Sequence, residues 1–166
     1  MTNMETAYFA GGCFWCITPV FRETEGVRDV VSGYSGGDEP NPSYEDVKYQ
    51  RTGHRETLRI DFDPGLVSFD DLLNIFLSSV DPFDGGGQFI DRGHSYTLAI
   101  YPLSEAQRHS AEAGITQLEV ESDQPVKIAL EAFKGFWPAE EYHQDYYRKH
   151  PEEFRRELIE SGRLKE

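Results

Sequence analysis

The chain has 166 residues, of which 38% are hydrophobic and 13% aromatic, so it can bury a core and is not expected to be disordered. Its formal net charge of −14 argues against nucleic-acid binding and against an anionic membrane surface. The most apolar stretch, residues 7–21, is too short for a transmembrane helix, and Glu5 precedes it where a signal peptide would carry basic residues. We therefore expect a single cytoplasmic domain over residues 1–166.

The first quarter of the chain predicts alternating strands and helices. The expected elements are a strand over residues 5–10, a helix from about Cys13 to Glu25, a strand over residues 27–34 and a loop over residues 38–43. Pro19 falls in the first two turns of that helix, where proline is tolerated best.

The rest of the chain continues the alternation. Residues 55–62 alternate apolar and polar side chains, as in a half-buried strand, and Ser68 begins a helix that ends near Asp81-Pro82. The remaining expected elements are a glycine-rich loop at 84–87, a strand at 96–101, a helix from Ser104 to about Glu119, a strand at 126–130 and a polar tail from 140 onward, helical in pieces. This order predicts an α/β (α+β) two-layer sandwich, with a mixed sheet, a ferredoxin-like core and an irregular C-terminal tail.

Both cysteines lie in the run Gly12-Cys13-Phe14-Trp15-Cys16. Cys13 follows two glycines and lies at the expected start of a helix. The unpaired amide groups at a helix start favour a thiolate, so Cys13 is the expected nucleophile. Cys16 lies one turn further along the same face, at a spacing that a disulfide tolerates. From the residues alone, buried core cysteines, a thioredoxin-like redox pair and a zinc site stay open. The histidines considered for zinc are His54, His94, His109, His143 and His150.

The run Phe9-Ala10-Gly11-Gly12-Cys13-Phe14-Trp15 resembles the active-site motif of the A-type peptide methionine sulfoxide reductases. The resemblance extends over about residues 5–150, and the joint spacing of its motifs makes it specific. The other matching segments are residues 33–37, 41–47, 52–56 and 81–82, then Asp91, Gly93 and Tyr96, and finally residues 141–144.

The resemblance implies an enzyme that reduces the S epimer of methionine sulfoxide, free or within proteins, to methionine. Cys13 matches the family's nucleophile, which becomes a sulfenic acid when it takes the oxygen. Glu56 matches the acid that protonates this oxygen, a role that requires burial to raise its pKa. Without the resemblance, Glu56 beside Arg55 would be interpreted as a solvated surface residue.

Five further positions match family residues that surround the substrate. Tyr44 and Tyr96 match phenols that hydrogen-bond the sulfoxide oxygen, and Asp91 matches a carboxylate that orders water or the surroundings of the cysteine. Phe14 and Trp15 match a hydrophobic wall for the substrate's methyl group. Taken alone, Phe14 and Trp15 would be interpreted as core residues, Tyr44 and Tyr96 as core or interface residues, and Asp91 as a loop acid or helix cap.

Cys16 is the main departure from the family, whose commonest motif has glycine at this position. No cysteine follows it in the chain. We expect Cys16 to attack the Cys13 sulfenic acid and form a disulfide that thioredoxin or a similar dithiol reduces. The alternative is that Cys16 only fills space and an external thiol resolves Cys13.

A second departure is the pair Phe89-Ile90 before Asp91, where family members more often have small or polar residues. This more apolar rim favours protein-bound over free methionine sulfoxide. No metal or organic cofactor is implied, and a monomer is expected. Two rival functions stay open, a general dithiol–disulfide oxidoreductase and a non-catalytic module that binds methionine-containing peptides.

Overall fold

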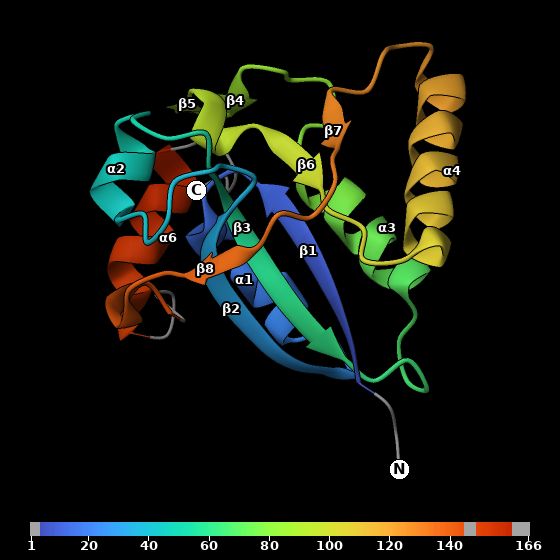
Figure 1. Ribbon diagram of the computed structural model, residues 1–166, viewed down its shortest axis with the longest axis horizontal. Helices are drawn as coiled ribbons and strands as arrows, with labels where there is room; N and C mark the ends of the chain where they lie inside the picture. The colour runs from blue at the N-terminus through green and yellow to red at the C-terminus, as the bar shows by residue number, and fades with distance from the viewer. Residues whose placement is uncertain (1–3, 145–148, 161–166) are drawn as a thin grey trace.

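The computed structural model describes residues 4–144 and 149–160. Its main sheet has six strands in the order β7-β6-β1-β3-β2-β8 (Figure 1). These strands are β1 (Glu5–Gly11), β2 (Val27–Ser35), β3 (Arg55–Phe62), β6 (Leu98–Ile100), β7 (Ile128–Leu130) and β8 (Phe136–Pro138). A separate two-stranded sheet pairs β4 (Gly87–Gln88) with β5 (Asp91–Arg92).

The helices are α1 (Phe14–Arg22), α2 (Tyr44–Lys48), α3 (Phe69–Ser79), α4 (Glu105–Ser122) and α6 (Pro151–Glu160), with 3-10 turns η1 (His94–Tyr96) and η2 (Glu141–His143). The sequence order β1-α1-β2-β3-α3-β6 and the antiparallel sheet order β6-β1-β3-β2 form the βαββαβ arrangement of ferredoxin-like folds. β7 pairs parallel with β6 and makes the sheet mixed, so the expected fold class is confirmed. None of the helices in the described ranges is long and apolar enough to cross a membrane.

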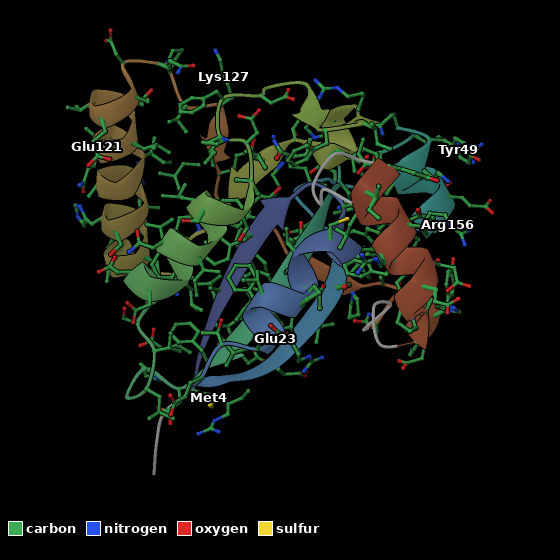
Figure 2. All side chains as sticks on the ribbon, turned by 180° about the vertical axis from the view of Figure 1, so that it is seen from behind. Met4, Glu23, Tyr49, Glu121, Lys127 and Arg156 are labelled. Atoms are coloured by element: carbon green, nitrogen blue, oxygen red, sulfur yellow. The ribbon has the colours of Figure 1, made fainter. Side chains whose placement is uncertain are left out.

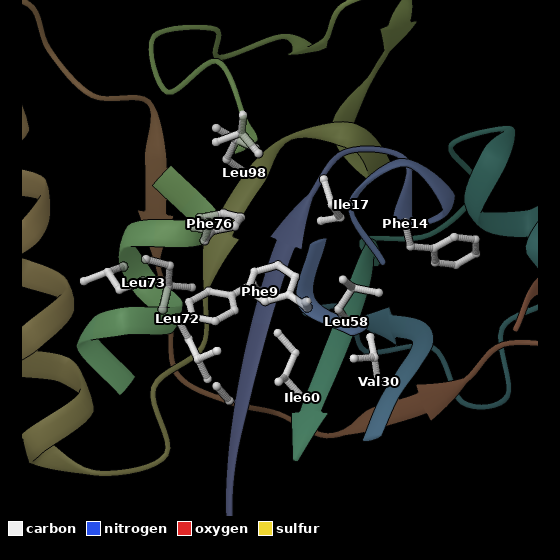
Figure 3. Packing of buried hydrophobic residues seen from close by; sticks show 14 of the residues in the cluster. Phe9, Phe14, Ile17, Val30, Leu58, Ile60, Leu72, Leu73, Phe76 and Leu98 are labelled. Atoms are coloured by element: carbon white, nitrogen blue, oxygen red, sulfur yellow. The ribbon is translucent and has the colours of Figure 1, made fainter. Parts of the chain in front are cut away.

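Helices α1 and α3 cover one face of the sheet, and α4 packs outside α3 (Figures 1 and 3). Phe9 of β1 lies at the centre of this core. Its ring is stacked 4.8 Å from that of Phe76 on α3 and 5.9 Å from that of Phe21 on α1. All three side chains are fully buried, so this aromatic stack joins both helices to the middle of the sheet.

The opposite face of the sheet is covered by the irregular segment between β7 and β8. Tyr8 and Tyr101 point to this side, and the Tyr8 ring is stacked 4.4 Å from that of Phe133. Strands β1 and β3 are buried along most of their length because helices cover one face of the sheet and the segment between β7 and β8 covers the other.

The two largest boundary differences from expectation are C-terminal helix ends: α1 stops at Arg22 rather than Glu25, and α4 continues to Ser122 rather than about Glu119. The amide of Thr24 donates to the carbonyl of Phe21, and Gly26, with φ of 94°, turns the chain into β2. The strand expected at 96–101 covers only Leu98–Ile100, because Tyr96 lies in η1.

Among the described residues, the elements that were not predicted are α2, β4, β5, η1 and β8. The helix expected from Ser68 is confirmed, with a complete capping box between Ser68 and Asp71. In the polar tail, η2 and α6 confirm helical pieces, while residues 145–148 and 161–166 lie outside the described part of the chain.

The substitution Phe76→Ala is expected to lower the free energy of unfolding by about 3–5 kcal/mol, because it removes a fully buried ring from the central stack. Urea denaturation followed by circular dichroism measures this loss. The matched control is Val120→Ala on the 76% exposed surface of α4, for which we expect a change below about 0.5 kcal/mol. Equal losses in the two variants would contradict the assignment of Phe76 to the core.

Candidate active site

Cys13 lies at the junction between β1 and α1, as N-cap of the helix. Gly12 precedes it with φ of 85°, a conformation that glycine adopts without strain. The amide of Cys16 donates to the carbonyl of Cys13 over 3.1 Å, which closes the first turn. The two cysteines are thereby placed one turn apart at the end of a buried strand, and no disulfide joins them.

A hollow of about 220 Å³ opens above Cys13. It brings together six of the eight expected site residues: Cys13, Trp15, Cys16, Tyr44, Asp91 and Tyr96. Two further lining residues, Lys48 and Glu160, were not indicated by the sequence. Of the apolar pair expected at the rim, Ile90 lines this hollow, whereas Phe89 lines a second one. Ile90 and Asp91 come from the β4–β5 hairpin, and Glu160 comes from the last turn of α6.

Glu56 does not line the hollow, but it lies close enough to Cys13, Tyr44 and Tyr96 to act on their pKa values. It is 1% exposed, on the helix-covered face of β3. Alternation along the strand explains this burial, because Glu56 points to the same face as the core residues Leu58 and Ile60. The amide of Phe14 donates to Glu56 Oε1 over 3.1 Å. The other oxygen, Oε2, is buried and has no hydrogen-bond partner among the described residues.

Burial raises the pKa of Glu56 to about 8, and the neighbouring Asp91 adds to this increase, while the Phe14 amide opposes it. At pH 7 the side chain is therefore mainly a neutral acid with a proton to give. The solvated surface position that its sequence neighbours suggested is wrong for this structure.

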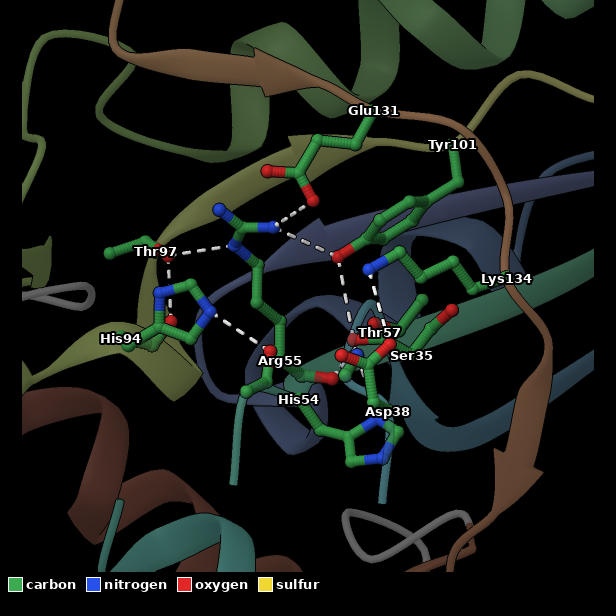
Figure 4. Close-up of polar contacts among 12 residues, drawn as sticks. Ser35, Asp38, His54, Arg55, Thr57, His94, Thr97, Tyr101, Glu131 and Lys134 are labelled. Carbon is green, nitrogen blue, oxygen red and sulfur yellow. Dashed lines mark hydrogen bonds and ion pairs between the residues drawn. The ribbon is translucent and has the colours of Figure 1, made fainter. Parts of the chain in front are cut away.

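Arg55 does not neutralise Glu56, because alternation points its guanidinium to the opposite face of β3 (Figure 4). There it donates from Nε to Thr97 Oγ1 over 2.8 Å and from Nη1 to Tyr101 Oη over 3.1 Å. Nη1 also pairs with Glu131 at 2.9 Å. This buried network fixes the N-terminal end of β3 and keeps a permanent positive charge away from the site.

The surroundings of Cys13 favour the thiol over the thiolate that its helix position suggested. A hydrogen bond with Cys16 and burial raise the pKa of Cys13 well above its usual range, and the acids Glu56 and Asp91 act in the same direction. These effects oppose the attraction of the helix amides for the thiolate.

Aromatic side chains build the walls of the hollow. The rings of Trp15 and Tyr44 are stacked with centroids 6.0 Å apart, and Phe14 lies 6.5 Å from Tyr44. Phe14 is 1% exposed and supports these two rings from below rather than lining the hollow. Burial and the nearby Glu56 raise the pKa values of the Tyr44 and Tyr96 phenols, so both remain hydrogen-bond donors.

His143 supports this wall and was missed as a site residue. Its Nδ1 accepts a hydrogen bond from Trp15 Nε1 over 3.1 Å, and its ring lies 4.2 Å from that of Tyr44. Burial lowers the pKa of His143 to about 4, so the ring is neutral at pH 7. The resemblance of residues 141–144 to the family was the one sequence signal for this residue. Nothing in the sequence indicated which side chains His143 contacts.

The residues around His143 fix the same wall to the sheet. Glu140 accepts hydrogen bonds from Tyr34 Oη over 2.9 Å and from the amide of Tyr44 over 3.1 Å. Gln144 pairs with both backbone groups of Ser32. Within the described ranges, no group of three or more His, Cys, Asp or Glu side chains could hold a metal ion.

Comparisons with known proteins agree with this geometry. The sequence profile "Peptide methionine sulfoxide reductase" matches residues 5–165. The chain is 46% identical to "Peptide methionine sulfoxide reductase MsrA" of Bacillus licheniformis over 161 residues, covering 96% of this chain and 89% of that protein. It is also 46% identical to "Peptide methionine sulfoxide reductase MsrA 2" of Rhizobium meliloti, covering 87% of this chain and 72% of that one.

Two solved structures share the fold. Methionine sulfoxide reductase A of Corynebacterium diphtheriae is 30% identical with a TM-score of 0.81, covering 91% of this chain and 77% of that one. Reduced Mxr1 from Saccharomyces cerevisiae is 26% identical with a TM-score of 0.84, covering 90% and 87%. The chain therefore belongs to the MsrA family of peptide methionine sulfoxide reductases, and its Cys13 and Cys16 lie in the Gly-Cys-Phe-Trp-Cys motif that lines the hollow.

Proposed function

We propose that this enzyme reduces the S epimer of methionine sulfoxide, free or within proteins, with Cys13 as nucleophile and Glu56 as acid. The observation that carries the proposal is the Oε2 of Glu56, buried and unpartnered among the described residues, on an acid whose pKa is raised to about 8. A neutral carboxyl group close to a cysteine-lined hollow supplies the proton that the sulfoxide oxygen needs in order to leave.

In the first step, the Cys13 sulfur attacks the sulfoxide sulfur and forms a sulfur–sulfur bond. Glu56 gives its proton to the sulfoxide oxygen and takes up the proton of the Cys13 thiol. The hydroxyl group then passes to Cys13, which breaks both the sulfur–oxygen bond of the substrate and the new sulfur–sulfur bond and releases methionine. Methionine sulfur is thereby reduced by two electrons, and Cys13 is oxidised by two electrons to a sulfenic acid.

The walls of the hollow hold the substrate during this step. The Tyr44 and Tyr96 phenols donate hydrogen bonds to the sulfoxide oxygen, and Trp15 packs against the methyl group with Phe14 behind it. Asp91, at the opposite rim, orders water and the surroundings of Cys13. His143 and Glu140 act on this wall indirectly, by holding Trp15 and Tyr44.

The enzyme is recycled through Cys16. Its thiol attacks Cys13 Sγ, a disulfide forms, and the hydroxyl group leaves as water with the proton of Cys16. Thioredoxin then reduces this disulfide, which places the enzyme in a reducing compartment such as the cytoplasm. Support for the partner comes from Mxr1, a protein of the same fold that has been solved in complex with Trx2. Residues 1–166 act as a single domain in a monomer.

The proposal is tested with the separate S and R epimers of an N-blocked methionine sulfoxide, with dithiothreitol as reductant. We expect turnover of the S epimer and at least about 100-fold slower turnover of the R epimer, because the Glu56 proton reaches only one face of the sulfur. The Cys13→Ser variant, which lacks the nucleophile, is the negative control. Equal rates on both epimers, or activity in Cys13→Ser, would overturn the proposal.

A further inference from the structure

Cys16 lies in the wall between two hollows. It lines the substrate hollow together with Cys13, and it also lines a second hollow of about 430 Å³ that Cys13 does not reach. The second hollow lies between α1, the end of α3, the β4–β5 hairpin and α6. Its lining residues are Cys16, Ile17, Val20, Ser78, Ser79, Val80, Asp81, Phe89 and Leu158.

The rim of this second hollow is apolar and exposed. Val20 on α1 is 40% exposed and Phe89 on the hairpin is 38% exposed, while Leu158 contributes from α6. Seen from behind, α1 and α6 lie side by side on this face of the molecule (Figure 2). Exposed apolar side chains gathered around a reactive sulfur are typical of a surface that another protein covers. We call Val20, Phe89 and Leu158 the Cys16 rim.

Phe89 is held in the rim at a conformational cost. Its φ of 54° lies in the left-handed region, which is unfavourable for an aromatic residue. Arg92 braces this turn by donating to the carbonyl of Phe89 over 3.2 Å and by a bidentate pair with Asp84. Backbone strain that the surrounding contacts enforce often accompanies a functional position.

The chemistry of disulfide reduction requires access from this side. Thiol–disulfide exchange is an in-line displacement, so a nucleophile that attacks Cys16 must approach from the side opposite Cys13. Cys13 itself lines the substrate hollow together with Trp15, Tyr44 and Tyr96. A dithiol protein cannot enter that hollow, whose volume of about 220 Å³ suits a single side chain.

We propose that the Cys16 rim is the docking surface for the protein dithiol that recycles the enzyme, and that this dithiol attacks Cys16 Sγ. The inference rests on the Cys13–Cys16 disulfide of the proposed function. The attacking thiolate forms a mixed disulfide with Cys16, and Cys13 leaves as a thiolate that takes up a proton. The second thiol of the reductant then displaces Cys16, so the reductant is oxidised by two electrons. Substrate and reductant therefore use different sides of α1.

The test compares two reductants on one pair of matched variants. Val20→Glu places a charge in the rim, and Val120→Glu places the same charge on the remote surface of α4. With thioredoxin as reductant, we expect Val20→Glu to raise the KM for thioredoxin about tenfold and Val120→Glu to leave it unchanged. With dithiothreitol, both variants are expected to retain the wild-type kcat and the wild-type KM for sulfoxide.

Phe89→Asn provides a second variant that keeps the fold, because asparagine tolerates the left-handed conformation. It removes the ring from the rim, and we expect a rise of about fivefold in the KM for thioredoxin with unchanged dithiothreitol activity. An unchanged KM for thioredoxin in both rim variants would overturn the docking site. A higher KM for oxidised peptide with dithiothreitol would also overturn it, because the rim would then hold substrate. Loss of sulfoxide reduction in the wild type with dithiothreitol would instead refute the proposed function.

Discussion

The Glu56→Gln variant is expected to lose about 100- to 10,000-fold in the single-turnover rate of methionine sulfoxide reduction at pH 7. Glutamine has nearly the same shape and its amide oxygen can still accept the hydrogen bond of the Phe14 amide, so the wall of the site stays in place. Its amide nitrogen cannot give a proton to the sulfoxide oxygen, which would then have to leave unprotonated. The measurement is formation of methionine in rapid-quench experiments with pre-reduced enzyme.

The pH dependence identifies Glu56 more specifically than the loss of rate. Because the pKa of Glu56 is raised to about 8, the fraction of enzyme that holds the proton falls as the pH rises through this value. The wild-type single-turnover rate is expected to show this falling limb, and Glu56→Gln is expected to lack it. Glu45→Gln, at an exposed acid on α2, serves as the control and should retain the limb. A limb that survives in Glu56→Gln would assign it to another group.

The same ionisation affects folding stability. The pKa of Glu56 lies above its ordinary value of 4.5, so the folded state binds the proton more tightly than the unfolded chain. The free energy of unfolding should therefore fall as the pH rises between about 4.5 and 8, with a slope of up to roughly 1.4 kcal/mol per pH unit from this group. In Glu56→Gln this slope should be absent, so the variant should be more stable than the wild type near pH 8.

The ferredoxin-like core could be predicted because its elements carry strong local signals. Arg55–Phe62 alternates as a strand with two different faces, and Ser68 with Asp71 caps α3 as the pattern indicated. The same alternation indicates that Glu56 shares a face with Leu58 and Ile60. The burial of Glu56 could therefore be predicted from its position in the strand, although its charged neighbour Arg55 suggested a surface position.

Other parts of the site depend on contacts between distant segments, which local patterns do not reveal. β8 is three residues long and becomes a strand only by pairing with β2. The contact between His143 and Trp15 joins residues 128 positions apart. The raised pKa of Cys13 likewise depends mainly on its hydrogen bond with Cys16 and on burial by distant segments of the fold, which the helix start alone does not reveal.

The Cys16→Ser variant is expected to lose multiple turnover with thioredoxin and to produce about one equivalent of methionine per enzyme. Cys16 is the second of two cysteines in the chain and lines the same hollow as Cys13, so no other internal thiol can resolve the sulfenic acid. A serine hydroxyl fills nearly the same volume but does not attack sulfur at neutral pH. The first step, which needs Cys13 and Glu56, proceeds in this variant, and the second step does not.

The two steps are separated by measuring methionine formed per enzyme over time and by mass spectrometry of the oxidised enzyme. Wild-type enzyme treated with sulfoxide should lose two hydrogens in the peptide that contains both cysteines, which marks the Cys13–Cys16 disulfide. Cys16→Ser should instead gain one oxygen at Cys13, since the sulfenic acid persists when no second thiol is within reach. Sustained turnover of Cys16→Ser with thioredoxin, at the wild-type rate, would show that Cys16 only fills space. In that case thioredoxin would have to attack Cys13 directly through the substrate hollow, and substitutions in the Cys16 rim would leave the KM for thioredoxin unchanged.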